Sequence, residues 1–382
     1  MSHPSLRGSR WWGAIGAVLC SSGCAGKSID VGANSNGGNS SAASATAAPR
    51  FTPTDAGTQS PFHLVDRQFN ETGPFVVNGK QIFWLAFNGN APFDGPSLFM
   101  RRCTTESCAA TIVDWAVASQ TQSAPGPLLS DSTRLFWPSQ NGSETLDSCA
   151  MVDCSAPTPL TLPPRVASYA VSGNLLIGTT ETGLLECSTA DCASTAHTVS
   201  VVSPTFSDDL TSWEVVADSD YAYLTNSSEI VRLRIDGSGA PQVIVQGQHD
   251  VASLTVRGDS VYWTQVGPLG AIRTCPKTGC VGEPREIIGG RLNPRSLAID
   301  DQSIYFVEGA VTIVPVAAPT PVVDEIYRCP ISGSTEPTLM AKNQGAGQLE
   351  VDDKYLYFGG GACADGKSNW QSNCGFIAVV PK

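Results

Sequence analysis

One short aromatic segment recurs along the chain and limits the folds that this sequence can adopt. The seven copies are QIFW (81–84), RLFW (134–137), LLIG (175–178), YAYL (221–224), SVYW (260–263), SIYF (303–306) and YLYF (355–358). Their third residues lie 53, 41, 46, 39, 43 and 52 positions apart. Aromatic and β-branched residues favour strands, and a repeat of this length is typical of blades arranged in a ring.

Each unit follows the same order. A short apolar strand precedes the aromatic one, as SLAID (296–300) precedes SIYF, and a polar turn such as NGK or DDQ joins them. Asn-Gly and Asp-rich turns favour a tight hairpin. A variable connection, a third strand and a fourth strand then follow. We therefore predict an all-β fold, a seven-bladed β-propeller with four antiparallel strands per blade.

The two ends of the repeat region complement each other. The segment 61–68 looks like a fourth strand without its first three, and the last unit, which ends in FIAVVPK, looks like three strands without a fourth. We expect this N-terminal strand to pair with the last blade. Such pairing closes the ring and removes an exposed sheet edge.

Cysteine pairs with the spacing C-x4-C fall at the turn between the third and fourth strands. The pairs are Cys103/Cys108, Cys149/Cys154, Cys187/Cys192 and Cys275/Cys280. In an exported protein this pattern predicts one small disulfide per hairpin. Zinc binding is the alternative, but it needs about four converging ligands and each pair belongs to a different blade. We expect no metal site and no cofactor.

The remaining cysteines of the repeat region are less regular. Cys363 and Cys374 flank a long insert and are expected to pair with each other. Cys329 has Ser334 at the position where its partner would stand, which leaves it either a buried free thiol or a thiol that exchanges with the nearby pair.

The N-terminus has the pattern of an export signal. Arg7 and Arg10 precede a short apolar stretch, WWGAIGAVL (11–19), which is too short to span a bilayer as a helix. The following SSGC (21–24) resembles a bacterial lipobox, and this resemblance implies that Cys24 becomes the lipid-modified first residue of the mature chain. Ser21 stands where that motif usually has an aliphatic residue; ordinary cleavage with secretion and an uncleaved anchor are the alternatives.

Composition separates the remaining segments. Residues 25–60 consist of Gly, Ser, Ala, Asn and Thr with almost no large apolar residue, which predicts a disordered tether. We therefore expect a signal peptide with lipobox over 1–24, the tether over 25–60 and the propeller over 61–382. The formal net charge of −12 argues against nucleic-acid binding.

Two units carry a family resemblance. VYWT (261–264) and the unit 223–245, with its Ile-x-Arg followed by Asp-Gly, resemble the YWTD-type propeller repeat. Gln265 and Asn226 stand where that family has the Asp of its tetrad, and the family domains usually have six blades. CPKTGC (275–280) resembles the cysteine turns of propellers in bacterial surface lipoproteins. These resemblances imply extracellular binding and bring no active-site motif with them.

Connections between second and third strands are short in units three, four and five and long in units six, seven and one, which become neighbours when the ring closes. Long loops on a rigid scaffold are where binding residues concentrate. We predict a ligand-binding surface there, with solvated loop residues as the alternative. Its candidate residues are Phe93, Asp94, Glu308, Asp324, Glu325, Asp365, Lys367 and Trp370.

Catalytic motifs are missing from the sequence. His63, His197 and His249 lie in different units and share no motif with Ser or Asp, and we predict no catalytic residue. Asp pairs such as Asp300–Asp301 and Asp352–Asp353 recur at one turn position, which indicates turn chemistry. We expect a monomeric, non-catalytic binding or scaffold module of the cell envelope, at the outer membrane or surface, or otherwise periplasmic or secreted. Its partner is a protein or carbohydrate, and it meets the membrane through the lipid anchor alone. A propeller hydrolase or lyase with a metal in the central channel is the alternative.

Overall fold

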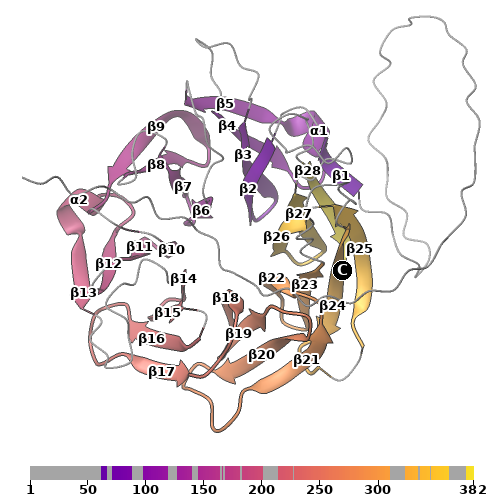
Figure 1. Ribbon diagram of the computed structural model, residues 1–382. Helices are drawn as coiled ribbons and strands as arrows, with labels where there is room; N and C mark the ends of the chain where they lie inside the picture. The colour runs from indigo at the N-terminus through magenta and orange to yellow at the C-terminus, as the bar shows by residue number, and fades with distance from the viewer. Residues whose placement is uncertain are drawn as a thin grey trace, which may run out of the picture. The chain divides into compact units, whose positions relative to one another are not determined.

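Seven four-stranded antiparallel sheets follow one another around a ring in the computed structural model (Figure 1). The structure describes residues 62–66, 71–87, 98–118, 127–139, 145–163, 166, 168–180, 183–200, 214–226, 228–309, 323–333, 336–344, 346–360 and 376–382. The predicted seven-bladed propeller is confirmed. Cys24, Phe93, Asp94, Cys363, Asp365, Lys367, Trp370 and Cys374 lie outside the described residues.

The blades follow the chain in order, and the first strand of each lies nearest the centre of the ring (Figure 1). Blade 1 has β2 (Glu71–Asn78), β3 (Gln81–Phe87), β4 (Leu98–Thr104) and β5 (Val113–Ala118); blade 2 has β6 (Leu129–Ser130), β7 (Arg134–Pro138), β8 (Thr145–Ala150) and β9 (Asp153–Thr161). Blade 3 has β10 (Tyr169–Ser172), β11 (Leu175–Thr179), β12 (Gly183–Ser188) and β13 (His197–Ser200); blade 4 has β14 (Glu214–Ala217), β15 (Tyr221–Thr225), β16 (Ile230–Arg234) and β17 (Gln242–Val245). Blade 5 has β18 (Val251–Arg257), β19 (Ser260–Gln265), β20 (Gly270–Pro276) and β21 (Arg285–Arg291); blade 6 has β22 (Arg295–Ile299), β23 (Ser303–Glu308), β24 (Val323–Pro330) and β25 (Thr338–Gln344). Blade 7 has β26 (Ala346–Val351), β27 (Tyr355–Gly360), β28 (Phe376–Pro381) and β1 (Phe62–Asp66).

The two chain ends close the ring as the sequence predicts. β1 pairs antiparallel with β28, with Phe62 opposite Val379 and Asp66 opposite Phe376. The N-terminal strand is thus the outermost strand of the last blade. We call the interface between blade 7 (β26, β27, β28 and β1) and blade 1 (β2–β5) the closing seam.

The apolar core is divided among the interfaces between blades, which we call seams. Each of the seven clusters of buried apolar residues combines side chains of two consecutive blades. The aromatic strands supply the largest buried side chains, including Trp84, Trp137, Trp263 and Tyr305. Because both faces of every sheet are covered, these strands are apolar at most positions rather than alternating.

The four predicted disulfides of the C-x4-C turns are present, at Cys103–Cys108, Cys149–Cys154, Cys187–Cys192 and Cys275–Cys280. Each closes a loop of about six residues, which stabilises by roughly 2 kcal/mol on the chain-entropy estimate. Two of these turns contain a one-turn helix that the sequence analysis did not predict, α1 (Cys108–Thr111) and α2 (Cys192–Thr195). Thr111 and Thr195 explain them, since each hydroxyl accepts from the backbone N–H seven residues earlier and donates to the carbonyl four residues earlier.

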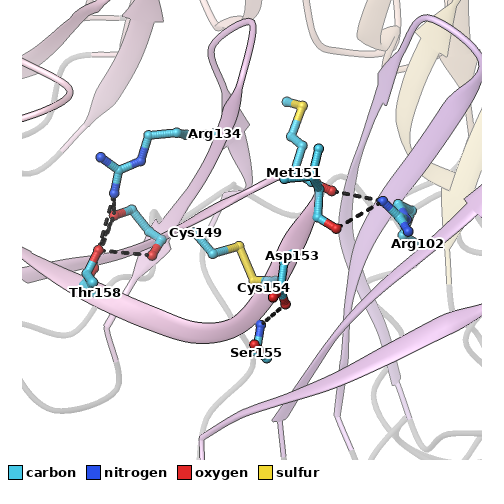
Figure 2. The surroundings of a disulfide bond; sticks show 10 residues. Arg102, Arg134, Cys149, Met151, Asp153, Cys154, Ser155 and Thr158 are labelled. Carbon is cyan, nitrogen blue, oxygen red and sulfur yellow. Dashed lines mark hydrogen bonds between the residues drawn. A yellow bond between two sulfur atoms is a disulfide. The ribbon is translucent and has the colours of Figure 1, made fainter.

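One cysteine turn also joins two blades. Arg102 of blade 1 donates from Nη1 to the carbonyl oxygens of Met151 (3.1 Å) and Val152 (3.4 Å) in the turn of blade 2 (Figure 2). The disulfide Cys149–Cys154 holds these two carbonyls in place. The disulfide-closed turn of blade 2 therefore supplies backbone hydrogen-bond acceptors to blade 1.

Candidate functional site

The candidate surface lies where the second strands of blades 6, 7 and 1 end. The connections that leave there run from Glu308 to Val323, from Gly360 to Phe376 and from Phe87 to Leu98, whereas that of blade 5 runs from Gln265 to Gly270. The pairing of β1 with β28 makes blades 7 and 1 neighbours, so these three connections leave adjacent blades on one side of the ring. Three of the predicted binding residues, all carboxylates of blade 6, belong to the described part of this surface.

Asp324 at the start of β24 is buried and paired. Its Oδ1 accepts a hydrogen bond from Nη2 of Arg295, which begins the inner strand β22. Gly309 allows this approach, because a Cβ at that position would lie 2.2 Å from Oδ1 of Asp324. Burying a carboxylate costs free energy unless it is paired and hydrogen-bonded. Asp324 thus fastens the stem of the long connection to the inner strand.

Glu308 ends β23 on the other stem of the same connection. Its Oε1 accepts from the backbone N–H of Leu292 at 2.7 Å, and its Oε2 accepts from Nη2 of Arg291. The Arg291 guanidinium also lies 4.7 Å from the ring centroid of Tyr327, a cation–π contact. Glu308 therefore ties the segment that links blades 5 and 6 to the stem.

Glu325 is the most accessible of the three carboxylates. Lys342 on β25 lies 2.5 Å from its Oε1, and the hydroxyl of Tyr327 donates to its Oε2 at 2.6 Å. The hydrogen bond from Lys342, followed by that from Tyr327, holds the pKa of Glu325 below its usual value. Burial, followed by the bond to Glu325, raises the pKa of Tyr327.

These contacts give the three carboxylates a structural role in blade 6. Each of them is bound to a cationic side chain, and Glu308 and Glu325 each accept a further hydrogen bond, so each fixes a stem of the connection between Glu308 and Val323. Arg291, Arg295 and Lys342 are their counter-ions, which the sequence analysis missed. Lys342 lies opposite Glu325 through the register of β24 and β25. Arg291 instead reaches Glu308 from the last strand of blade 5, and Arg295 reaches Asp324 from the inner strand of blade 6. The participation of Glu308, Asp324 and Glu325 in ligand binding stays a prediction.

Other reactive groups of the described part are placed as follows. No three His, Cys, Asp or Glu side chains among the described residues form a group able to hold a metal ion. Cys329 on β24 is a free, buried thiol, and burial raises its pKa to about 11. A thiol with that pKa is protonated at neutral pH and is a poor nucleophile. In the described segments no helix is long and apolar enough to cross a membrane.

The aspartates of the hairpin turns stabilise these turns through hydrogen bonds. Asp300 accepts from the backbone N–H groups of Gln302 (2.9 Å) and Ser303 (2.7 Å), and from the hydroxyl of Tyr305 (3.0 Å). Asp352 makes the same set with Lys354, Tyr355 and Tyr357. The prediction that the recurring Asp pairs serve turn formation is confirmed for the first member of each pair.

Comparison with known proteins supports the fold and identifies no family. No family model matches the chain, and no curated protein matches it. Among solved structures, U3-55K matches with a TM-score of 0.54 and 12% identity over 85% of this chain and 98% of its own. The extracellular domain of BT4673 from B. thetaiotaomicron matches with a TM-score of 0.54 and 12% identity over 84% of this chain and 40% of its own. The nidogen/laminin complex gives a TM-score of 0.43 and 13% identity over 60% of this chain and 85% of its own.

The geometry defines the class of fold, and the two matches with a TM-score of 0.54 agree with it. The chain forms an all-β, seven-bladed propeller, a scaffold that hosts many unrelated functions. Its disulfides are of the kind that persist in oxidising compartments. At identities of 12–13% the likeness to solved structures concerns the fold alone.

Proposed function

We propose that this chain is an exported, surface-tethered binding module that holds a protein or carbohydrate partner of the cell envelope. In this proposal Cys24 carries the lipid anchor, residues 25–60 form the tether, and the propeller presents the surface formed by the long connections of blades 6, 7 and 1. The observation that carries it is the placement of these three connections on adjacent blades of a closed ring.

The scaffold beneath that surface is rigid for identifiable reasons. Every seam has its own apolar cluster, and the stems of the blade 6 connection are fixed by ion pairs to Arg291 and Arg295. Rigid support lowers the entropy lost when loops bind a partner. The disulfides add to this stiffness, and they also suit a location outside the cytoplasm.

Capture by the purified full mature chain tests the proposal. The probes are isolated cell-wall polymer and, separately, solubilised envelope proteins of the source cell, each tested with the wild-type chain and with Trp370→Ala. We expect the wild type to retain one of the two probes and Trp370→Ala to retain less than a tenth of it, because aromatic anchors dominate such interfaces. Leu269→Ala is the matched control, since Leu269 is an exposed side chain on the short connection of blade 5.

Two outcomes would overturn the proposal. Retention that is equal for the wild type and Trp370→Ala would place binding elsewhere. A stoichiometric metal in the purified chain, together with hydrolysis or elimination that stops when the metal is removed, would favour the channel enzyme instead.

A further inference from the structure

The inner strand of blade 7 carries a carboxyl group at a position where the other blades do not. The position compared is the one two residues before the turn that joins the first and second strands of each blade. Blades 1 to 6 have an apolar residue or threonine there, whereas blade 7 has Glu350. The six equivalents of Glu350 are Val76, Leu129, Ala170, Val216, Thr255 and Ala298.

Glu350 faces the closing seam. It lies directly opposite Tyr357 on β27, and directly opposed residues of antiparallel strands point to the same face of the sheet. Tyr357 is buried in the cluster that blade 7 forms with Phe75, Ile82 and Trp84 of blade 1. The carboxyl group therefore lies at the inner end of the interface that closes the ring.

Two hydrogen bonds connect the strand that carries Glu350 to blade 1. The backbone N–H of Phe75 donates to Oε1 of Gln348 at 3.1 Å, and Nε2 of Gln348 donates to the carbonyl of Phe75 at 2.6 Å. Gln348 and Glu350 lie two residues apart on β26 and therefore point to the same face of the sheet. The carboxyl group of Glu350 thus lies beside a contact between residues that are 273 positions apart in the sequence.

The surroundings of Glu350 disfavour its charged form. The side chain keeps some accessible surface, yet protein encloses it on most sides, and this burial raises its pKa to about 7, against the lowering effect of the Gln348 hydrogen bond. The strands β2, β26, β27 and β28 that build this part of the seam contain no Lys, Arg or His.

The nearby charged groups have other partners. Tyr357 donates its hydroxyl to Asp352 at 2.7 Å. Arg295 on the preceding inner strand binds Asp324, and Arg101 on β4 binds Asp114 at 2.6 Å. The side chain of Glu71, at the start of β2, lies outside the described side chains.

We propose that Glu350, Gln348 and the Phe75 backbone form a pH-responsive clasp, which keeps the closing seam tight while the Glu350 carboxyl is protonated and loosens the seam as it ionises. The sign follows from proton binding. The pKa of Glu350 is higher in the folded chain than the ordinary value of 4.5, so between pH 4.5 and about 7 the folded state binds more protons than the unfolded state. Stability from this group is greatest below pH 4.5 and falls as pH rises to about 7.

Thermal unfolding of the full chain between pH 5 and pH 8 tests the clasp. Glu350→Gln keeps the size and hydrogen-bonding capacity of the side chain and cannot ionise. We expect the Tm of the wild type to fall, relative to that of Glu350→Gln, by about 4 °C over this range. Glu283→Gln is the matched control, because it removes the same charge from an exposed position of blade 5 and should follow the wild type.

Hydrogen exchange then localises the effect. At pH 8 the amides of β1, β2, β26 and β28 should exchange at least threefold faster in the wild type than in Glu350→Gln, while those of blades 3 and 4 should exchange equally. At pH 5 the two proteins should agree throughout. Should Glu350→Gln fold poorly, Glu350→Val, which copies the residue of blades 1 and 4, serves as the second variant. Parallel pH profiles for the wild type and both variants would overturn the proposal.

Discussion

Blades 4 and 6 form their first hairpin turn with aspartate, whereas blades 1, 3 and 5 form the same turn with glycine. Asp218 and Asp300 each bind two backbone N–H groups of their own turn and a tyrosine hydroxyl of the following strand. Gly79, Gly173 and Gly258 instead adopt φ values of +58°, +57° and +53°. The comparison shows two local solutions for one turn of the repeat: a side-chain cage built by its first residue, and a left-handed backbone at its second residue.

The aspartate turns and the glycine turns also differ in the contacts that they make with the next blade. Lys277 of blade 5 donates to Asp218 of blade 4 at 2.6 Å, and Lys382 of blade 7 donates to Asp300 of blade 6 at 2.7 Å. The glycine turn of blade 5 contributes Arg257, whose partner Asp301 is almost fully exposed. An aspartate turn therefore shapes its hairpin and also holds the next blade, and removing it should cost more than perturbing a glycine turn.

The largest expected effect is that of Asp300→Ala. It leaves Tyr305 and Lys382 without their acceptor and opens the turn, and we expect a loss of about 3 kcal/mol in the free energy of unfolding. Urea unfolding followed by tryptophan fluorescence measures it. Asp301→Ala, at the exposed neighbouring position, should change stability by less than about 0.5 kcal/mol. Equal losses in the two variants would show that the cage contributes nothing beyond the turn.

The second, smaller expected effect is the loss of the stabilisation provided by Asp300 at acid pH. Burial alone would raise the pKa of Asp300, but the hydrogen bonds from Lys382, from two backbone N–H groups and from Tyr305 outweigh it and lower the pKa to about 2. A lowered folded-state pKa means that the stabilisation is present above pH 4 and disappears as pH falls to about 2.

We therefore expect the stability advantage of the wild type over Asp300→Asn to shrink by about 2 kcal/mol between pH 4.5 and pH 2. The asparagine variant keeps an acceptor for the turn and cannot titrate. Urea midpoints at pH 4.5, 3.5, 2.5 and 2 provide the measurement. A constant difference between the two proteins across this range would contradict the assignment of the lowered pKa to Asp300.

Sequence reasoning succeeds where the determinants are local. The aromatic strands, the hairpin turns at Asp300 and Gly258, and the C-x4-C disulfides each depend on residues a few positions apart, so spacing alone predicts them. The closing pair β1–β28 was predictable for another reason, since an unpaired strand at each end of a repeat array leaves one complementary arrangement.

Contacts across seams are beyond such reasoning. Lys382 and Asp300 lie 82 positions apart, and Gln348 and Phe75 lie 273 apart, so their pairing depends on how blades rotate against one another. The counter-ion of Glu308 was missed for the same reason, since Arg291 belongs to blade 5. That of Asp324 was missed because Arg295 lies 29 positions away on a strand of the same sheet that is not adjacent to β24. Glu350 did leave a signal, because QLEV (348–351) places a charge where the aligned SLTV (253–256) and SLAI (296–299) have Thr255 and Ala298.

Gly258→Ala should give the smallest of the three effects and isolates the backbone part of the comparison. No atom lies within 4 Å of the position that a Cβ would take, so the substitution meets no steric obstacle from its surroundings. What remains is the cost of a left-handed φ of +53° for a residue with a side chain, and we expect a loss of about 1 kcal/mol. Gly347→Ala is the control, because Gly347 has no positive φ and its nearest neighbour, the carbonyl of Gly359, lies 3.9 Å away.

Gly258→Asn sharpens the comparison between the two kinds of turn. Asparagine tolerates the left-handed region better than alanine because its short polar side chain bonds to nearby backbone groups. We expect it to recover at least half of the loss caused by Gly258→Ala in urea unfolding, yet to fall short of an aspartate turn. Position 258 is the second residue of its turn, whereas Asp218 is the first, and blade 6 has no lysine at the position equivalent to Lys277. Cys329 begins the corresponding turn of blade 6, and the residue equivalent to Lys277 there is Ile331. If alanine and asparagine proved equally costly, backbone conformation would not be what the glycine turns supply.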